Sequence, residues 1–136
     1  MSQENVEIVR EVVALWNRPR EPIRNRELLD RFAADVVIDM TRRVFNPDIY
    51  EGHDGLRRLG RDVASVWRDF RVDLERVIDA GDRVVVIETR HGRGVGSDVE
   101  VTNRSAVIWT IRNGRVVRME TDLEPDDALK AVGLEE

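Results

Sequence analysis

The chain has 136 residues, a net charge of −5 at pH 7 and no cysteine. This length suits a single domain over residues 1–136, and the lack of cysteine excludes disulfides, thiolate metal sites and cysteine nucleophiles. Because the chain is acidic and shows neither a leader pattern nor a membrane-length apolar run, we expect a cytoplasmic protein that binds neither nucleic acid nor membrane.

Helices are predicted for most of the first half of the chain. Residues 4–17 carry valines and Trp16 at helical spacing, which indicates an amphipathic helix. The prolines within residues 18–24 end it. A short second helix follows with Phe32 on its buried side, and the next apolar run predicts a short strand that ends near Asp39.

A loop and the clearest helix of the chain come next. Residues 41–53 show no periodicity and are predicted to be a loop that covers a pocket mouth. Asp54 is a suitable N-cap for a third helix, whose apolar face runs to Phe70. Gly60 lies within this helix and suggests close packing against the sheet. Residues 71–79 alternate as a strand does.

The second half is predicted to be an antiparallel meander. Three β segments fill residues 81–123, joined by a glycine-rich loop at 92–97 and by Asn113-Gly114, whose residues tolerate the positive φ of a type I′ turn. Pro125 then starts a short C-terminal helix. Helices followed by a meander define an α+β domain whose helices cover one face of the sheet.

Two motifs that suggest chemistry are better explained as structure. The glycine-rich loop is followed by a strand rather than a helix, which argues against a phosphate-binding loop. The histidines are His53 and His91, and the cluster Glu51-x-His53-Asp54 has no established metal spacing. We therefore expect no metal and no cofactor.

Asp39 is the carboxylate with the strongest claim to a functional role, because it closes the apolar run at residues 36–38. In a low-dielectric space its pKa would rise, which suits a general base near neutral pH. The alternative is that Asp39 caps the following loop or pairs with Arg42 or Arg43.

Large side chains on several elements are candidate walls of a pocket. Trp16 and Trp109 lie on elements expected to face each other, and Tyr50 lies in the loop. Alternation separates Met119 and Leu123 from the charged residues of the last strand. The alternative for the tryptophans is plain core filling.

Strand parity also divides the sheet into two faces. It places Asn103 on the same, more apolar face as Trp109, as a candidate hydrogen-bond donor. The opposite face mixes apolar and ion-pairing side chains, which resembles a subunit interface, and we expect a homodimer. Its expected members are Thr102, Arg104, Ala106, Ile108, Val116, Arg118 and Glu120.

Four segments in order resemble the nuclear-transport-factor-two-like superfamily, in particular its SnoaL-like branch. They are REVVALWN, FAADVVIDM through YEGHDGLRRL, AGDRVVV, and AVIWTIRNGRVVRME. The resemblance runs from about residue 5 to residue 134. It implies a cone-shaped α+β barrel of the NTF2-like or cystatin-like kind, with a curved antiparallel sheet covered by three N-terminal helices, a deep pocket and frequent dimerisation through the sheet.

The superfamily also contains ketosteroid isomerases and polyketide cyclases, and the resemblance transfers their active sites only in part. Asp39 falls where the isomerases keep their general-base aspartate. Their first-helix tyrosine is replaced near Glu11, and their second acid falls at residues 105–107, which supply none. The cyclase aspartate falls near Thr121, whereas this chain has Asp122, which strand parity assigns to the opposite face.

The resemblance therefore predicts a pocket for a small, largely apolar organic molecule, with isomerase, cyclase or hydrolase activity as the candidate chemistry. Within it we expect Asp39 to act as a general base or polar anchor and His53 to lie at the rim. The competing hypothesis is a non-catalytic ligand-binding or protein-interaction module of the same fold, since function depends on the site rather than on the fold.

Overall fold

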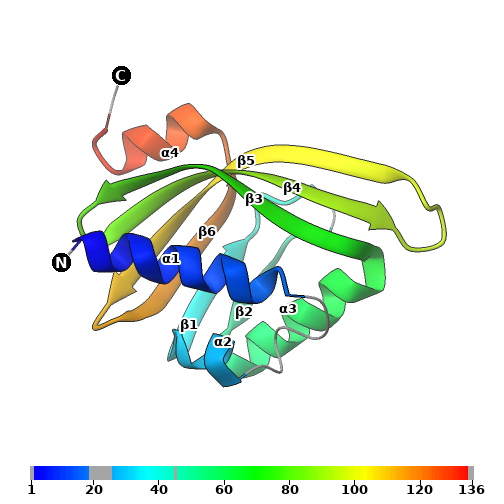
Figure 1. Cartoon of the computed structure of the whole chain (residues 1–136), viewed down its shortest axis with the longest axis horizontal. Helices are drawn as coiled ribbons and strands as arrows, with labels where there is room; N and C mark the ends of the chain where they lie inside the picture. The colour runs from blue at the N-terminus through cyan, green and yellow to red at the C-terminus, as the bar shows by residue number, and fades with distance from the viewer. Residues whose placement is uncertain (1, 19–25, 45, 135–136) are drawn as a thin grey trace.

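A curved six-stranded sheet with helices on both sides makes up the structure, a computed structural model that describes residues 2–18, 26–44 and 46–134 (Figure 1). The predicted α+β class is confirmed. The predicted break at residues 18–24 lies outside the described residues apart from Arg18. In chain order the elements are α1 (Ser2–Trp16), α2 (Arg26–Asp30), β1 (Phe32–Met40), β2 (Asp48–Glu51), α3 (Gly52–Val66), β3 (Trp67–Ala80), β4 (Arg83–Gly94), β5 (Glu100–Arg112), β6 (Arg115–Leu123) and α4 (Pro125–Ala131).

The strand order β2-β1-β6-β5-β4-β3 leaves β2 and β3 as edges, so the sheet curves without closing into a barrel. The last three strands form the predicted antiparallel meander, β3 extends it to four strands, and Asn113 and Gly114 both take positive φ in its final turn, as predicted. The β1–β6 pair is parallel, which corrects the expectation of a wholly antiparallel sheet. A long stretch of chain, residues 41–114, separates β1 from β6, so no tight hairpin forces this pair to be antiparallel.

Three local expectations are corrected. The predicted loop at residues 41–53 contains β2, which is too short to show a period of its own. The N-cap of α3 is Glu51, and Asp54 lies in the first turn of the helix. The helix ends at Val66, because Trp67 takes an extended conformation and pairs with Gly94 of β4.

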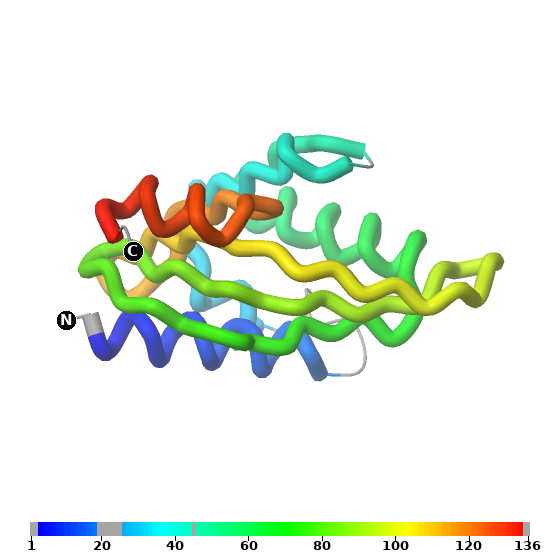
Figure 2. Tube along the Cα trace, turned by 90° about the horizontal axis from the view of Figure 1, so that it is seen from above, coloured from blue at the N-terminus to red at the C-terminus, as the bar shows by residue number. Residues whose placement is uncertain are grey.

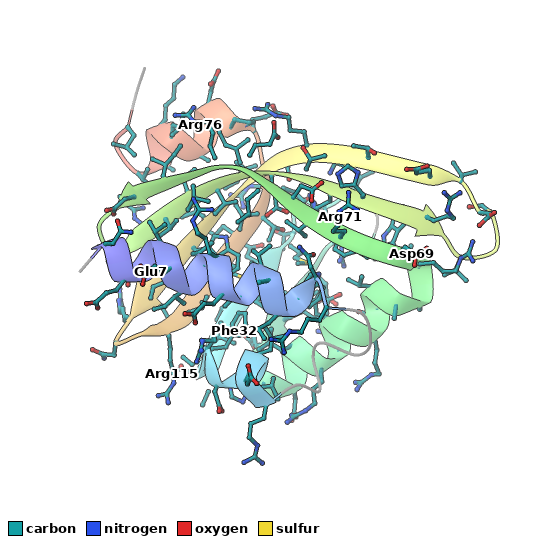
Figure 3. All side chains as sticks on the ribbon, viewed as in Figure 1. Glu7, Phe32, Asp69, Arg71, Arg76 and Arg115 are labelled. Carbon is teal, nitrogen blue, oxygen red and sulfur yellow. The ribbon has the colours of Figure 1, made fainter. Side chains whose placement is uncertain are left out.

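The sheet separates two apolar cores. The larger lies between the sheet and α1, α2 and α3, and the smaller lies between the sheet and α4. Figure 2 shows α1 and α4 on opposite sides of strands β3 and β4. Ala106 and Ile108, expected on an open sheet face, are instead buried near Ala128 and Leu129 of α4. Charged side chains such as Glu7 and Arg115 point away from the cores (Figure 3).

Gly55 permits close packing of α3, and the close packing suggested for Gly60 stays a prediction. A methyl group on Gly55 would come within 2.9 Å of the carbonyl carbon of Tyr50. The helix therefore packs directly on the backbone of β2 at this point. None of the helices described is long and apolar enough to cross a membrane.

Candidate functional site

A cavity of about 140 Å³ lies between the concave face of the sheet and helices α1 and α3, and it is partly open to solvent. Its walls are mostly apolar, with Leu56 and Leu59 from α3 facing Val107 from β5. An engineered apolar cavity of similar size in another protein holds benzene. The space therefore suits an organic molecule of about one ring.

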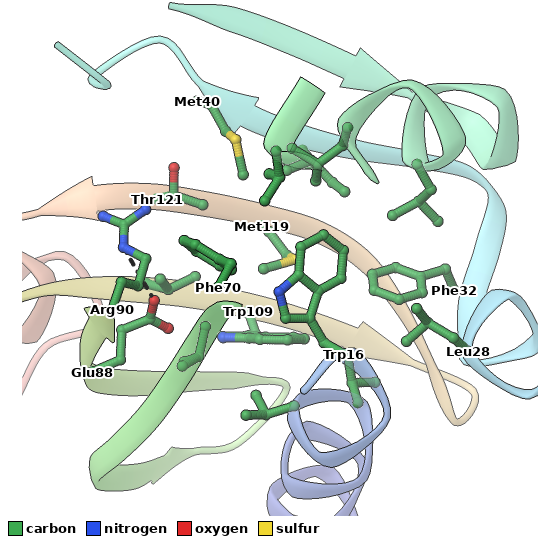
Figure 4. A pocket seen from close by; sticks show the side chains of 18 of the residues that line it. Trp16, Leu28, Phe32, Met40, Phe70, Glu88, Arg90, Trp109, Met119 and Thr121 are labelled. Atoms are coloured by element: carbon green, nitrogen blue, oxygen red, sulfur yellow. Dashed lines mark ion pairs between the residues drawn. The ribbon is translucent and has the colours of Figure 1, made fainter. Parts of the chain in front are cut away.

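Aromatic side chains form one wall of this cavity (Figure 4). The Trp16 ring meets the Phe70 ring edge to face, with 6.4 Å between the centroids, and Trp109 is 3% exposed. The structure thus brings together Trp16, Trp109 and Met119 from the predicted set of walls, and all three line the cavity.

Glu88 is the buried titratable group of the cavity. It projects from β4 into the apolar wall, and the residue is 5% exposed. Burial raises the pKa of Glu88 from 4.5 to about 7; the Arg90 charge opposes this rise and the Asp122 charge adds to it. Near neutral pH this carboxyl group is present in both protonation states.

Arg90 connects Glu88 to the neighbouring strands. Its Nε lies 3.5 Å from Glu88 Oε2, while Nη2 donates to Ser105 Oγ at 2.9 Å and to Asp122 Oδ1 (Figure 4 shows the Glu88–Arg90 pair). One guanidinium therefore lies between two carboxylates. This arrangement compensates the Arg90 charge within the protein.

Three buried side-chain atoms have no hydrogen-bond partner within the part of the chain that the structure describes: Arg43 Nε, Arg90 Nε and Trp109 Nε1. All three are N–H donors on residues that line the cavity. In Figure 4 the ring nitrogen of Trp109 points toward the end of the cavity that holds Glu88. Buried donors without partners are costly, so this wall is suited to a ligand that supplies acceptors.

Asp39 does not line the cavity. Its neighbours Ile38 and Met40 do, which puts the Asp39 side chain on the other face of β1. The carboxylate accepts hydrogen bonds from Thr41 Oγ1 at 2.6 Å and Thr41 N at 2.9 Å, and Arg118 lies 3.5 Å away. These Thr41 bonds lower the pKa of Asp39, so the predicted rise is wrong and the loop-capping alternative is the one observed.

The other predicted site residues lie outside the cavity lining. Tyr50 is fully buried beneath α3, and the His53 ring nitrogen Nε2 is 3.0 Å from the carbonyl oxygen of Phe32. Leu123 packs in the core under α4, on the far side of the sheet. Asn103 is exposed, because the β4–β5 hairpin extends past the helices and both of its faces meet solvent there (Figure 1).

Sequence reasoning missed Glu88 and Arg90 as site residues, although a signal was present. Val84, Val86, Glu88 and Arg90 share one face of β4 by alternation, so two charged residues continue an apolar stripe. Asp122 was assigned to the opposite face from Thr121. It takes a positive φ of 61°, and at this irregular position its carboxylate accepts a bond from Thr121 Oγ1 and still reaches Arg90.

The described residues hold no cluster of three or more histidine, aspartate or glutamate side chains that could bind a metal. The candidate site is therefore built from one carboxyl group, N–H donors and apolar walls.

A curved sheet wrapped around an apolar cavity and covered by helices is the architecture of the NTF2-like class of proteins, and solved structures of that class match nearly the whole chain. Within this class the chain belongs to the SnoaL-like domain family, whose profile matches residues 9–119. No match was found among curated proteins.

Three similar solved structures share the fold at low sequence identity. A protein with a ketosteroid isomerase-like fold from Catenulispora acidiphila DSM 44928, in complex with trimethylamine, is 19% identical with a TM-score of 0.74, covering 94% of this chain and 93% of that chain. TerC, co-crystallised with polyporic acid, is 23% identical with a TM-score of 0.74 and coverage of 95% and 98%. A putative SnoaL-like polyketide cyclase from Jannaschia sp. CCS1 is 18% identical with a TM-score of 0.74 and coverage of 88% and 85%.

Proposed function

We propose that this chain binds a small, largely apolar organic molecule in the cavity and moves a proton on it through Glu88. The observation that carries the proposal is a carboxyl group buried in an apolar wall with a pKa of about 7. Such a group can accept and donate a proton at neutral pH, as an isomerase, cyclase or hydrolase requires. We assign to Glu88 the general-base role that the sequence suggested for Asp39.

A donor in the same wall supplies the complementary chemistry. Trp109 Nε1 makes no hydrogen bond within the described part of the chain and can donate to a ligand oxygen on which negative charge develops, whereas Arg90 Nε forms an ion pair with Glu88 Oε2 at 3.5 Å. Trp16 and Met119 contact the apolar body of the ligand. Two of the similar structures were crystallised with small organic molecules, which supports a ligand in this chain as well.

A screen of single-ring compounds tests this proposal. Binding should raise the melting temperature and shift the indole N–H resonance of Trp109. Val107→Phe should abolish binding, because the larger ring fills the cavity, whereas Val101→Phe on the exposed part of the same strand should not. Failure of every single-ring compound to bind the wild type would contradict the proposal.

Turnover of any bound compound distinguishes catalysis from binding alone. The rate should change with an apparent pKa near 7 that is lost in Glu88→Gln and retained in Asp39→Asn. Binding without turnover would favour the non-catalytic module. Loss of activity in Asp39→Asn but not in Glu88→Gln would show that Asp39, and not Glu88, is the general base.

The second part of the proposal is a homodimer in the cytoplasm, formed through the part of the outer sheet face that α4 leaves uncovered. That face retains exposed Thr102 and Arg104, together with the Arg118–Glu120 ion pair at 3.3 Å. Thr102→Glu would place like charges near each other across a two-fold interface and should weaken the dimer. Sedimentation velocity at micromolar concentration measures this, with Ser65→Glu on α3 as the control. A wild-type monomer would refute the dimer.

A further inference from the structure

Arg43 is a half-buried cation in the cavity wall that the proposed chemistry does not use. It follows β1, and its guanidinium reaches the cavity beside Met40. Its Nη1 donates to Met40 Sδ at 3.4 Å, and its Nη2 donates to the carbonyl oxygen of Asn46 and to Tyr50 Oη. Its Nε makes no hydrogen bond within the part of the chain that the structure describes.

Among the described residues, the hydrogen-bond partners of Arg43 are all neutral. No carboxylate oxygen of the described residues lies within ion-pair distance of it, which sets it apart from Arg58 and Arg90. Burial and the hydrogen bond to Asp62 raise the pKa of Tyr50, so the tyrosine hydroxyl stays protonated and brings no negative charge. The Tyr50 ring, 5.7 Å from the Arg43 guanidinium carbon, gives only a modest cation–π contribution.

Tyr50 holds Arg43 in this position. Its hydroxyl donates to Asp62 Oδ2 at 2.6 Å and accepts from Arg43 Nη2 at 3.1 Å, and the ring is fully buried. These bonds fix the guanidinium of a residue that lines the cavity and leave its buried Nε without a hydrogen bond within the described part of the chain. Two carboxylates lie nearby without pairing directly with Arg43: Asp48, whose pKa is lowered by its bond to Arg58 and more weakly by the Arg43 charge, and Asp62, which is separated from Arg43 by the Tyr50 hydroxyl. The buried Arg43 Nε still lacks an acceptor, which a ligand carboxylate would supply.

We infer that Arg43 anchors a carboxylate, and that the ligand of this cavity is a single-ring organic acid. The inference rests on the proposed function, since it names the ligand class for the same cavity. Arg43 is the better anchor than Arg90, because Arg90 already lies between Glu88 and Asp122. Both hydrogens of Arg43 Nη2 already donate within the protein, so the ligand carboxylate would accept one charge-assisted hydrogen bond from Nε. Tyr50 acts as a positioning residue.

Benzoate and benzamide test the inference, because they share a ring and a similar size and differ in charge. At pH 7 the wild type should bind benzoate about 10- to 100-fold more tightly than benzamide, the range expected for a charged hydrogen bond. Isothermal calorimetry or the indole N–H shifts of Trp16 and Trp109 measure both affinities. This comparison needs no variant.

Variants test whether Arg43 causes the preference for benzoate over benzamide. Arg43→Met should reduce the affinity for benzoate to the affinity for benzamide, while the affinity for benzamide stays close to that of the wild type. Arg43→Lys should keep part of the preference, and Tyr50→Phe should reduce it, since the ring remains but the hydroxyl does not. Arg42→Met, at the exposed neighbouring arginine, should change neither affinity.

The outcomes separate this inference from the proposed function. Equal affinities of the wild type for benzoate and benzamide, or an unchanged preference of Arg43→Met for benzoate, would overturn the carboxylate anchor. Neither result would contradict the proposal that the cavity binds an apolar ligand. Failure of both compounds to bind would overturn the anchor and count against the cavity as a ligand site of this size.

Discussion

Replacing Glu88 with glutamine should make the protein more stable than the wild type in alkaline solution. Glutamine keeps the shape of the side chain and cannot ionise. The wild-type carboxyl group must ionise inside an apolar wall once the pH exceeds about 7. A rise in pKa from 4.5 to about 7 corresponds to about 3 kcal/mol, at about 1.4 kcal/mol per pKa unit.

The direction follows from proton linkage. Between pH 4.5 and about 7 the folded wild type holds a proton on Glu88 that the unfolded chain has released, so stability falls as pH rises through this window. Below pH 4.5 both states are protonated, and above about 7 both are ionised, so the loss is complete. The lowered pKa values of Asp39 and Asp73 act in the opposite direction at lower pH and are shared by both proteins.

Urea unfolding at pH 5 and pH 8 measures this effect. The free energy of unfolding of Glu88→Gln, taken relative to the wild type, should increase by up to about 3 kcal/mol between the two pH values. Glu100→Gln, at an exposed carboxylate on β5, should show no such change. A difference that is the same at both pH values would mean that Glu88 titrates normally.

Gly55→Ala should destabilise the fold by about 1–3 kcal/mol, the usual cost of overpacking. The added methyl group would lie 2.9 Å from the Tyr50 carbonyl carbon and 3.3 Å from its Cα, so α3 would have to move off the backbone of β2. A glycine-to-alanine change inside a helix otherwise stabilises it by up to about 1 kcal/mol. The expected effect therefore has the opposite sign to helix propensity.

Gly60→Ala provides the matched control within the same helix. Gly60 is half-buried and lies five residues further along, and helix propensity alone predicts that its replacement is neutral or stabilising. Thermal unfolding of the two variants gives the comparison. Equal melting temperatures for Gly55→Ala and Gly60→Ala would show that helix α3 moves away from β2 without cost.

Much of the fold was predictable because it depends on local patterns. The helical spacing of Trp16, the alternation along β4 to β6 and the turn at Asn113-Gly114 each specify an element from neighbouring residues. The parallel β1–β6 pair was not predictable in this way, since it depends on where a distant strand arrives.

The site was harder to predict because burial is a property of the whole fold. Asp39 follows an apolar run yet lies on the far face of β1, since alternation turns it away from Ile38. Asn103 has the correct parity but lies where the hairpin extends beyond the helices. Glu88 was visible as a charge in an apolar stripe, but only the packed helices show that solvent cannot reach it.

The Arg90–Asp122 pair joins β4 to β6 across the intervening β5. Asp122 reaches Arg90 from an irregular position of β6, where its φ is positive, so one side-chain contact connects two strands that are not neighbours. A ligand that separates these strands would break the contact and move the Asp122 charge away from Glu88. Because the Asp122 charge adds to the rise that burial causes in the pKa of Glu88, ligand binding would then make Glu88 more acidic.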